Sequence, residues 1–541
     1  MRTPTSHKTI VQKAGIFLFT TALLVFTASL FFTSFRLDQN AVQTAINNDY
    51  HWQFIEPELK PLEGQEYGNV FSFMSAYNAA MYQAQTAVKN DVEGKLGLTT
   101  NDGEYWNKVL QDYAVKSSRF AVAKASAGGL LPGNLWLFFA LSFGMGILGA
   151  FLYILPKLRE LPGIKNNGIF HSKLHNRGWL GIALGTWLIA FYILLYFYPE
   201  YLVSWTILAD PVSKALNGGP ASQWFLYGFL YTIAILVMGV RMMIKYRHNP
   251  YQLFRTASVM FFQTAFAFLI PQVMQALNMP AHDLKNIWPL DYSFFYEYRL
   301  NELINNGTLG LVMLFWGIAL IIIGVPLFTF FFGKRWYCSW VCGCGGLAET
   351  LGDPFRQLSD KRLKAWKIER YLIHGVLVFA VVMTALVLYT YFSGSSRVLF
   401  LDSYTVRGWY GFAIGSIFAG VVGTGFYPLM GNRVWCRFGC PLAAYLGIVQ
   451  RFRSRFRITV NGGQCISCGN CSTYCEMGID VRHYAQRGQD VVRASCVGCG
   501  ICAAVCPRGV LRLENASADV AQRTEQLRVI LIKDGKAVLA D

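Results

Sequence analysis

Long apolar runs separated by polar and charged loops set the pattern of this chain. Eight such runs are long enough to cross the roughly 30 Å hydrocarbon core of a bilayer as helices. They cover residues 14–35, 133–155, 179–198, 222–240, 255–274, 308–332, 371–392 and 408–429. The first run lacks a cleavage site of the A-x-A kind, so we expect it to remain as an anchor. The pattern predicts about eight transmembrane helices.

The segments between and after these runs suggest six divisions. Residues 36–130 are polar and free of cysteine, and helical spacing through 70–88 and 105–122 predicts a helical domain. Residues 527–539 predict a short hairpin in the tail. The expected divisions are the N-terminus with the first anchor (1–35), the helical domain (36–130), spans two to five (131–307), spans six to eight (308–460), a cysteine-rich domain (461–515) and the tail (516–541).

Composition and charge narrow the class of protein. Hydrophobic residues make up 54% of the chain and charged residues only 15%, which is typical of a membrane protein. The formal net charge of +17 would suit nucleic acid, but the basic residues gather beside the ends of the apolar runs and form no basic groove motif. We therefore expect the lipid bilayer as a partner and no nucleic acid.

The loops alternate in charge along the chain. Lysine and arginine gather in the loops that follow the second, fourth, sixth and eighth runs, whereas the intervening loops are acidic and hold few bases. Because basic loops stay on the cytoplasmic side, this alternation places both termini in the cytoplasm and residues 36–130 in the periplasm. We expect a multi-pass protein of the bacterial inner membrane whose cysteines face a reducing compartment.

Eight of the thirteen cysteines form two runs of the pattern C-x2-C-x2-C-x3-C. The runs are Cys465, Cys468, Cys471 and Cys475, then Cys496, Cys499, Cys502 and Cys506, followed by Pro507. Each run presents three thiolates from one tight loop and a fourth from a distance, as [4Fe–4S] clusters require. Structural zinc is the alternative, because it also binds paired C-x2-C cysteines. Two four-cysteine runs, the second ending in C-P, favour clusters.

These runs resemble the bacterial-type two-cluster ferredoxins, in which the fourth ligand is exchanged between runs. The resemblance implies one cluster on Cys465, Cys468, Cys471 and Cys506 and a second on Cys475, Cys496, Cys499 and Cys502. One departure is Glu476, which stands where the first run would normally have proline. A longer insert, residues 477–495, separates the runs. We expect these departures to alter the surface beside one cluster.

A second cysteine pattern repeats at the ends of the sixth and eighth runs. A glycine, an arginine, an aromatic residue and two cysteines align without a gap in segments 333–344 and 431–441. The paired cysteines are Cys338 and Cys342 in the first copy and Cys436 and Cys440 in the second, with Cys344 as a spare ligand. On a helical path residues i and i+4 share a face, so each pair would point at one object.

Three interpretations of the four paired cysteines stay open. They could jointly hold an additional metal or iron–sulfur centre, because soft thiolates suit iron–sulfur or Cu(I). They could act as a reversible dithiol or copper relay. They could also be small residues that allow close packing, since free cysteine is often buried. The repeat favours the first two, and in the first the neighbouring Arg433 and Arg437 would favour the reduced, more negative state.

A two-cluster ferredoxin joined to spans ending in C-x3-C-P is similar to the NapH/NosR/CcoG group of membrane polyferredoxins. The similarity covers roughly residues 308–515, and residues 1–307 carry no motif that matches it. The eighth run ends in the group's Cys436, Cys440 and Pro441, whereas the sixth has Gly343 in place of proline. Pattern and resemblance together imply an all-α polytopic membrane protein with a C-terminal α+β ferredoxin-like domain.

Two functions follow from these features. The first is an iron–sulfur protein that relays single electrons between a cytoplasmic donor or the quinone pool and a membrane or periplasmic acceptor. The second is a maturation factor that reduces or handles copper or another metal for a respiratory enzyme. Both need a redox partner protein, and no catalytic residue is assigned. No histidine falls in the middle of a predicted span, so quinone or a partner, rather than intrinsic haem, would carry electrons across.

Overall fold

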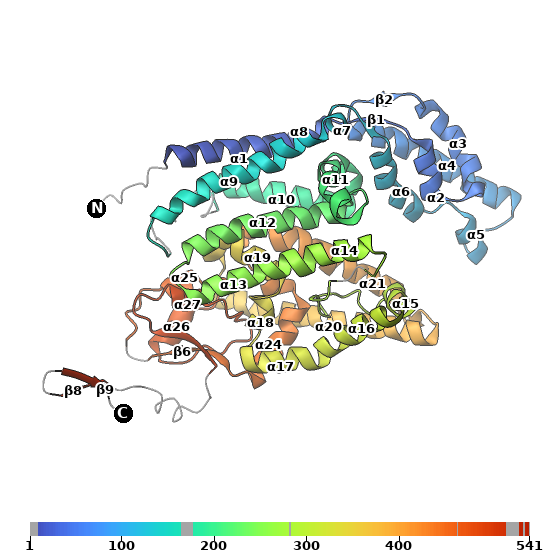
Figure 1. The fold of residues 1–541 in the computed structure, drawn as a ribbon. Coiled ribbons are helices and arrows are strands. Elements are labelled where there is room, and N and C mark those ends of the chain that lie inside the picture. Colours follow the sequence, from blue (N-terminus) through green and yellow to red (C-terminus); the bar gives the residue numbers. More distant parts are fainter. Residues whose placement is uncertain are drawn as a thin grey trace. The chain divides into compact units, whose positions relative to one another are not determined.

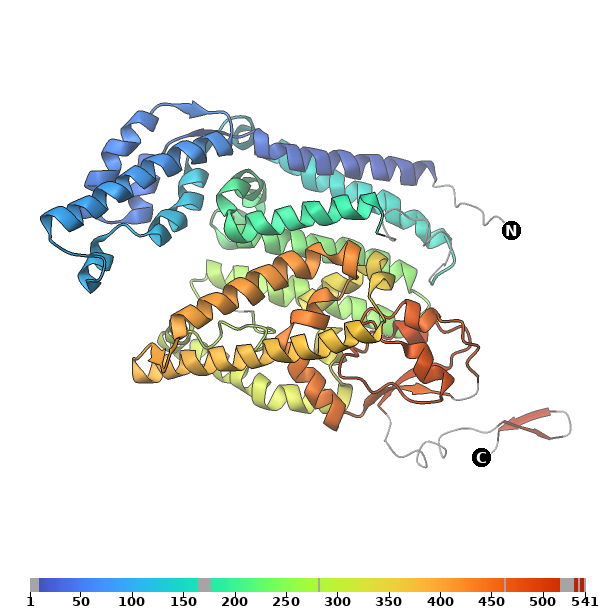
Figure 2. The same ribbon diagram turned by 180° about the vertical axis from the view of Figure 1, so that it is seen from behind.

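The computed structural model describes residues 9–163, 177–280, 283–461, 464–515, 530–533 and 536–539. Helices dominate these residues, and the strands are short (Figures 1 and 2). The chain divides into two compact units. The main segments of the smaller unit are Ser6–Glu160 and Ala190–Tyr231, and those of the larger unit are Leu161–Ile189 and Thr232–Asp541. The division passes through α10 (Trp179–Phe197) and α12 (Gln223–Lys245).

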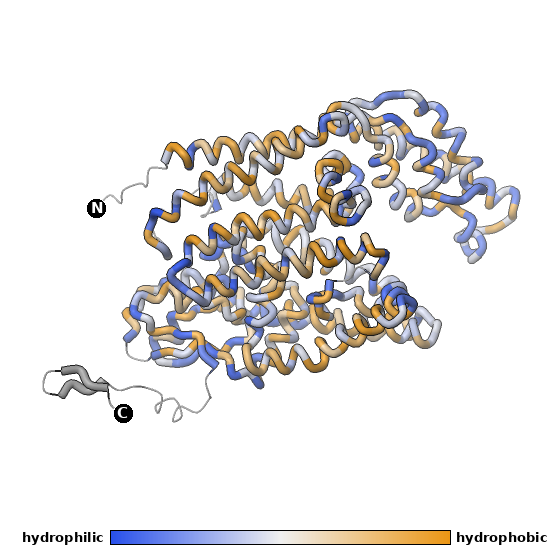
Figure 3. The backbone as a smooth tube through the Cα atoms, in the orientation of Figure 1, coloured by the Kyte–Doolittle hydropathy of each residue, from blue (hydrophilic) through white to orange (hydrophobic). Residues whose placement is uncertain are grey.

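Seven helical stretches of the described residues are long and apolar enough to span a membrane. They are Ile10–Phe31, Leu135–Arg159, Trp179–Phe197, Gln223–Lys245, Pro250–Ala276, Gly307–Phe332 and Leu363–Ser393. They match seven of the predicted runs and are largely hydrophobic in Figure 3. The chain is therefore a multi-pass membrane protein.

The eighth predicted run, 408–429, is a less regular helical path. It consists of α21 (Ser403–Tyr410), the π-helical η9 (Gly411–Val422) and α22 (Gly423–Gly425). Glycine recurs along this path at positions 408, 411, 415, 420, 423 and 425. Because glycine contributes little hydropathy, the mean hydropathy of this path is lower than that of the seven stretches above.

The smaller unit joins a polar helical region to apolar helices. Its helices are α1 (Ile10–Ala28), α2 (Gln39–Ile46), α3 (Asp49–Leu59), α4 (Val70–Lys95), α5 (Gly103–Lys108), α6 (Asp112–Ala125), α7 (Leu130–Gly133), α8 (Leu135–Phe139), α9 (Met145–Ile154) and α11 (Val203–Asn217). Strands β1 (Ser34–Arg36), β2 (Glu66–Tyr67) and β3 (Ala127–Gly128) form an antiparallel sheet in the order β2-β1-β3. The helical spacing read through 70–88 and 105–122 corresponds to α4, α5 and α6.

Helices α1 and α9 pack closely through glycine and lie side by side in both views (Figures 1 and 2). A Cβ atom added at Gly15 would lie 2.7 Å from Gly149 O, and one added at Gly149 would lie 2.6 Å from Phe19 N. Backbones approach this closely only where side chains are absent, as at small-residue interfaces of membrane helices.

Replacing Gly149 with leucine is expected to force α1 and α9 apart. The separation can be followed with the pair Ala22→Cys and Gly146→Cys, because a Cβ at Gly146 would lie 3.4 Å from Ala22 Cβ, close to disulfide distance. The cross-link should form in the parent chain and fail with Gly149→Leu. Gly144→Leu is the matched control, since a Cβ at Gly144 meets nothing within 4 Å. Equal cross-linking in both leucine variants would contradict the glycine contact.

The larger unit combines further spans with the cysteine-rich segment. Its helical elements are α13 (Pro250–Phe261), η6 (Phe262–Leu269), α14 (Ile270–Ala276), α15 (Glu297–Asn305), α16 (Gly307–Ala319), η7 (Leu320–Gly324), α17 (Val325–Phe332), α18 (Arg335–Cys338), α19 (Gly343–Thr350), η8 (Asp353–Leu358), α20 (Leu363–Ser393), α21, η9, α22, α23 (Tyr427–Met430), η10 (Trp435–Gly439), α24 (Pro441–Arg453), α25 (Asn470–Thr473), α26 (Val481–Gln486) and α27 (Ile501–Ala504). Helix α24 packs between α17 and α20.

Short strand pairs complete the larger unit. Strands β6 (Phe456–Val460) and β7 (Leu511–Asn515) pair antiparallel, which brings the two ends of the cysteine-rich segment together. Strand β4 (Arg397–Val398) pairs with β5 (Leu401–Asp402). In the tail, β8 (Ile530–Lys533) pairs with β9 (Lys536–Leu539), as predicted, while the predicted turn at residues 534–535 lies outside the described residues.

One hydrophobic core runs from the membrane helices of the larger unit into the cysteine-rich segment. It contains Val325 of α17 and Ile373 of α20 together with Phe456 and Leu511 of the β6–β7 pair. The buried cysteines of this core are Cys338, Cys342, Cys436, Cys440, Cys471, Cys496 and Cys502. Both cysteine patterns therefore share one core, and the cysteine-rich segment is packed onto the spans.

Candidate functional site

The first predicted set of cysteines surrounds a small cavity. Cys465, Cys468, Cys471 and Cys506 all line it, with Pro507 and Leu511 among the other residues of its wall. Cys468 is exposed and Cys471 is buried, so the cavity lies near the surface of the cysteine-rich segment. The structure thus brings the fourth cysteine of the second run to the first three of the first run, as the ligand exchange requires.

The second predicted set is more deeply placed. Cys496 and Cys502 are buried, and Cys475 and Cys499 are partly buried. The Cys502 thiol is close enough to Cys499, Cys496 and Cys475 for their charges to raise its pKa, after burial, which is the largest cause. Buried thiols in this number stay protonated unless a bound metal takes the place of their protons, so the set is suited to a metal cluster.

Backbone contacts fasten the loop of the second run to the membrane-proximal part of the larger unit. Four successive carbonyl groups, those of residues 496–499, accept hydrogen bonds from side chains outside the loop. The donors are Gln450 to Cys496 O at 2.9 Å, Ser339 to Val497 O at 2.8 Å, Tyr251 to Gly498 O at 2.7 Å and Gln252 to Cys499 O at 2.8 Å. The position of these cysteines is therefore set by α13, α24 and the first C-x3-C segment.

The two C-x3-C segments adopt matching positions at helix ends. Gly333 and Gly431 begin the copies with φ of +63° and +94°, a region that L side chains rarely adopt, which explains the repeated glycine. In each copy the second cysteine is the N-cap residue of the next helix, Cys342 for α19 and Cys440 for α24. The Ala443 N–H donates to Cys440 Sγ at 3.4 Å.

The spacing predicted that the two cysteines of each pair share one α-helical face. The structure shows no continuous α-helix through the described residues of the pairs. In the second copy, residues Trp435–Gly439 form the π-helical η10, and Cys440 is extended with φ −81° and ψ +111°. The π turn and the extended cap nevertheless bring the cysteines together. Burial is the main cause that raises the pKa of the Cys440 thiol, and the charges of Cys436, Cys342 and Cys338 raise it further.

Cys344 also lies at this cluster of thiols. A hydrogen bond from Cys344 lowers the pKa of Cys342 to about 6, while burial opposes this shift. The charges of Cys436 and Cys440 also act on Cys344. Cys344 therefore lies beside Cys342 and close to Cys436 and Cys440.

Arg433 stands at the centre of a buried ion-pair network behind the paired cysteines. Its side chain pairs with Glu349 and with Glu476, the latter at 3.0 Å. Its Nη1 also donates to Cys338 O at 3.3 Å and to Cys436 Sγ at 3.6 Å. One guanidinium thus contacts both copies of the repeat and the residue next to Cys475.

Further buried pairs extend this network. Arg356 pairs with Glu476 and with Asp353, and Arg255 pairs with Glu349 at 2.7 Å. The members are the bases Arg241, Lys245, Arg255, Arg356 and Arg433 and the acids Glu349, Asp353 and Glu476. The Arg433 charge lowers the pKa of the Cys338 and Cys436 thiols, against the larger effect of burial, because positive charge stabilises thiolates.

Glu476 was expected to alter the surface, and this expectation is wrong. Its side chain is fully buried, and Asn432 Nδ2 donates to its Oε2 at 3.2 Å. Burial by itself would raise the pKa of Glu476, but Arg356 and Arg433 lower it to about 2. The carboxylate that replaces proline therefore joins the first cysteine run to the ion-pair network.

Arg437 and Lys334 differ from what the sequence suggested. Arg437 Nε donates to Glu369 Oε2 at 2.6 Å, so Glu369 balances the charge of Arg437. Of the two arginines, Arg433 is therefore the one whose charge would act on a centre at the paired cysteines. Lys334, which was not singled out, is buried, and its charge opposes the burial that raises the pKa of Cys338 to about 12 and of Cys496 to about 11. The sequence feature that could have indicated a role for Lys334 is its position between the glycine and the arginine of the repeat.

The cysteine side chains of the described residues do not converge on single points. Within the described part of the chain, no three His, Cys, Asp or Glu side chains converge closely enough to hold a single metal ion. A single zinc ion would draw four sulfurs to about 2.3 Å from one point. The thiols instead surround a space, most clearly the cavity of Cys465, Cys468, Cys471 and Cys506.

Comparison with known families agrees with this geometry. Residues 464–511 match the model described as a 4Fe-4S dicluster domain. Residues 313–363 and 410–459 both match the model described as a 4Fe-4S binding domain, and these segments contain the two C-x3-C copies. The chain has the features of a membrane polyferredoxin. The double match confirms the internal repeat, because both C-x3-C copies lie in segments similar to the same 4Fe-4S binding model.

Two curated proteins show similarity to this chain. YccM of Escherichia coli (strain K12), named for electron transport, is 27% identical over 155 residues, which are 27% of this chain and 43% of YccM. The methylamine utilization ferredoxin-type protein MauN of Methylobacillus flagellatus (strain ATCC 51484 / DSM 6875 / VKM B-1610 / KT) is 28% identical over 162 residues, which are 27% of this chain and 50% of MauN. The chain thus spans at most half the length of these relatives. No solved structure matches it.

Proposed function

We propose that this protein is an iron–sulfur electron carrier of the bacterial inner membrane, with both termini in the cytoplasm. It passes single electrons between a cytoplasmic donor or the quinone pool and a membrane or periplasmic acceptor. Both similar proteins are named for electron transport or as ferredoxin-type, which supports this class of function. The alternation of basic and acidic loops supports the orientation.

Three cysteine sets would hold the redox centres. Cys465, Cys468, Cys471 and Cys506 hold one [4Fe–4S] cluster, and Cys475, Cys496, Cys499 and Cys502 hold the other. Cys338, Cys342, Cys436 and Cys440 hold a further iron–sulfur centre, with Cys344 beside it. Bound clusters supply one-electron chemistry. The chain's own residues position these sets and set the charge around them.

The observation that carries the proposal is the direct attachment of the second run to the C-x3-C segments. Ser339 lies between the paired cysteines of the first copy and bonds the carbonyl next to Cys496. The Lys334 charge lowers the pKa of Cys338 and of Cys496, one thiol of each pattern, and Arg433 bridges both copies to Glu476. These contacts hold the second run and both C-x3-C copies in one buried core, and positive charge there favours the reduced state of nearby centres.

Replacing Cys436 with serine tests the third centre. Protein purified without oxygen should contain more than the about eight irons of two cubes, and the variant should lose the excess. Trp435→Phe, which changes a buried neighbour but no cysteine, should keep it. Iron at the two-cube level in the parent chain would contradict the third centre.

The same variant separates the alternative function. Copper bound by the parent chain and lost with Cys436→Ser would favour the metalloenzyme maturation role, for which the closely spaced thiols of Cys342 and Cys344 are suitable soft ligands. The donor is tested by mixing quinol with the purified protein and recording the cluster spectrum. A spectrum that quinol leaves unchanged would remove the quinone pool as the donor.

A further inference from the structure

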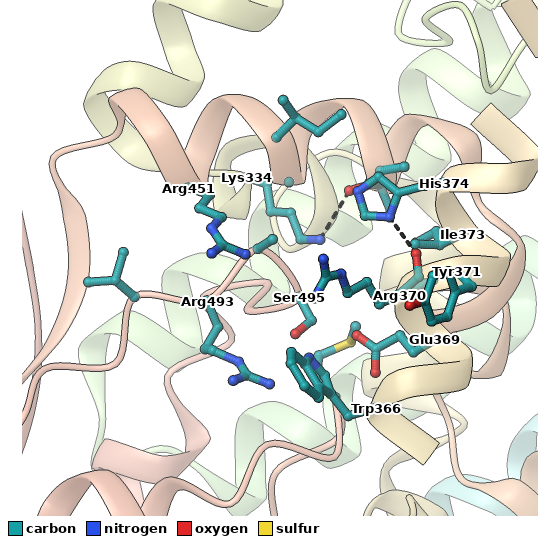
Figure 4. A pocket seen from close by; sticks show the side chains of 18 of the residues that line it. Lys334, Trp366, Glu369, Arg370, Tyr371, Ile373, His374, Arg451, Arg493 and Ser495 are labelled. Carbon is teal, nitrogen blue, oxygen red and sulfur yellow. Dashed lines mark hydrogen bonds between the residues drawn. The ribbon is translucent and has the colours of Figure 1, made fainter. Parts of the chain in front are cut away.

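A pocket of about 690 Å³ opens between α20, α24 and the loop of residues 492–495 (Figure 4). Helix α20 contributes Trp366, Arg370 and His374, and α24 contributes Arg451. Cys436 lies in the wall, and Ser495, which precedes Cys496, lines the loop side. A pocket of this size accommodates a small molecule or a lipid headgroup.

The pocket is strongly basic. Its cationic side chains are Lys334, Arg370, Arg451 and Arg493, which surround the same space in Figure 4. Glu369 is the acid that lines it, and Glu369 is already engaged by Arg437. Among the described residues, the ion pairs join no acid to any of these four bases.

Two of these bases are held in place by neutral groups. Lys334 is only 1% exposed, and its Nζ donates to Ala443 O at 3.2 Å. Arg493 donates to the Tyr484 hydroxyl at 3.0 Å and stacks 4.7 Å from the Trp366 ring. Gathering four like charges around one cavity, one of them buried, costs free energy that a bound anion recovers. Arginine forks suit the paired oxygens of a phosphate.

A second feature indicates that the anion belongs to an amphiphile. A shallow, open apolar groove lies on the neighbouring face of α20, and residues of this helix alone line it: Lys367, Ile368, Tyr371, Leu372, Gly375, Val376 and Phe379. Tyr371 lines both the groove and the basic pocket. Since α20 is one of the membrane-spanning helices, the groove leads from the pocket along the span.

We propose that the basic pocket binds the phosphate headgroup of an anionic phospholipid, with an acyl chain along the groove of α20. Basic pockets between spans on the cytoplasmic side suit such headgroups. The bound phosphate would place negative charge beside Cys436 and Cys496. This last consequence rests on the proposed function, whereas lipid binding itself needs no cluster.

Lipid retention tests the proposal. Protein is reconstituted in mixed phosphatidylcholine and phosphatidylglycerol, re-extracted in detergent, and its bound lipid is measured by native mass spectrometry. The parent chain should retain phosphatidylglycerol over phosphatidylcholine. The double variant Arg370→Gln with Arg451→Gln should bind it about 30-fold more weakly, from two basic contacts. Both arginines are exposed, so folding should not suffer.

The matched control is Lys364→Gln with Arg453→Gln, which removes one exposed base from each of the same two helices outside the pocket. It should retain lipid like the parent chain. Equal loss in both double variants would overturn the site, and so would no loss in either. If inorganic phosphate alone displaces the lipid, the pocket binds free phosphate and the assignment of a lipid headgroup is wrong. Because retention is measured independently of iron, failure here leaves the electron-transfer proposal standing.

Discussion

Replacing Glu476 with glutamine is expected to destabilise the larger unit by about 3–5 kcal/mol. Glutamine keeps the shape of the side chain but removes the negative charge that Arg356 and Arg433 share. Both arginines are almost fully buried, so their charges cannot turn to water. Thermal unfolding of the detergent-solubilised protein, followed by tryptophan fluorescence, should show a clearly lower midpoint.

The control for this prediction is Asp360→Asn. Asp360 also pairs with an arginine, but the side chain of Arg362 is 82% exposed. Water screens this pair, so its loss should leave the midpoint nearly unchanged. A midpoint that moves as little with Glu476→Gln as with Asp360→Asn would show that the buried network contributes little to stability.

Replacing Cys499 with serine is expected to remove one whole cluster, about four irons per chain. Cys499 belongs to the deeper set, whereas the other set surrounds a separate cavity. Iron and sulfide counting after purification without oxygen measures the loss. Zinc in place of iron in the parent chain would refute the cluster assignment.

Double variants then test the exchanged ligand. If Cys465 and Cys506 serve one cluster, their double serine variant should lose no more iron than either single variant. Combining Cys506→Ser with Cys499→Ser should remove both clusters. The opposite result, additive loss for Cys465 with Cys506, would assign each run its own cluster.

Local sequence signals predicted much of this molecule. Long apolar runs located seven spans because a bilayer demands length and apolarity from consecutive residues. The cysteine spacings found both patterns, and the repeated glycine marks a real backbone requirement at Gly333 and Gly431. The structure places Cys506 with the first run, as the ferredoxin resemblance implied.

The network could not be predicted, because its partners lie far apart along the chain. Arg255 of α13, Glu349 of α19 and Arg433, just before η10, meet only once these separate elements have packed together. Glu476 therefore looked like a surface substitution, although it is buried. The repeat also concealed a divergence: Arg335 occupies the position of Arg433, yet it lies 4.7 Å from the Phe456 ring instead of in the network.

The four carbonyl contacts of residues 496–499 have a consequence for how a partner must approach. Because its main chain is hydrogen-bonded to neighbouring elements, this segment cannot move away as a mobile domain to reach another protein. A redox partner must therefore dock onto this segment where it lies. The exposed Cys468 marks the surface at which a partner would come nearest to the cavity of the first cysteine set.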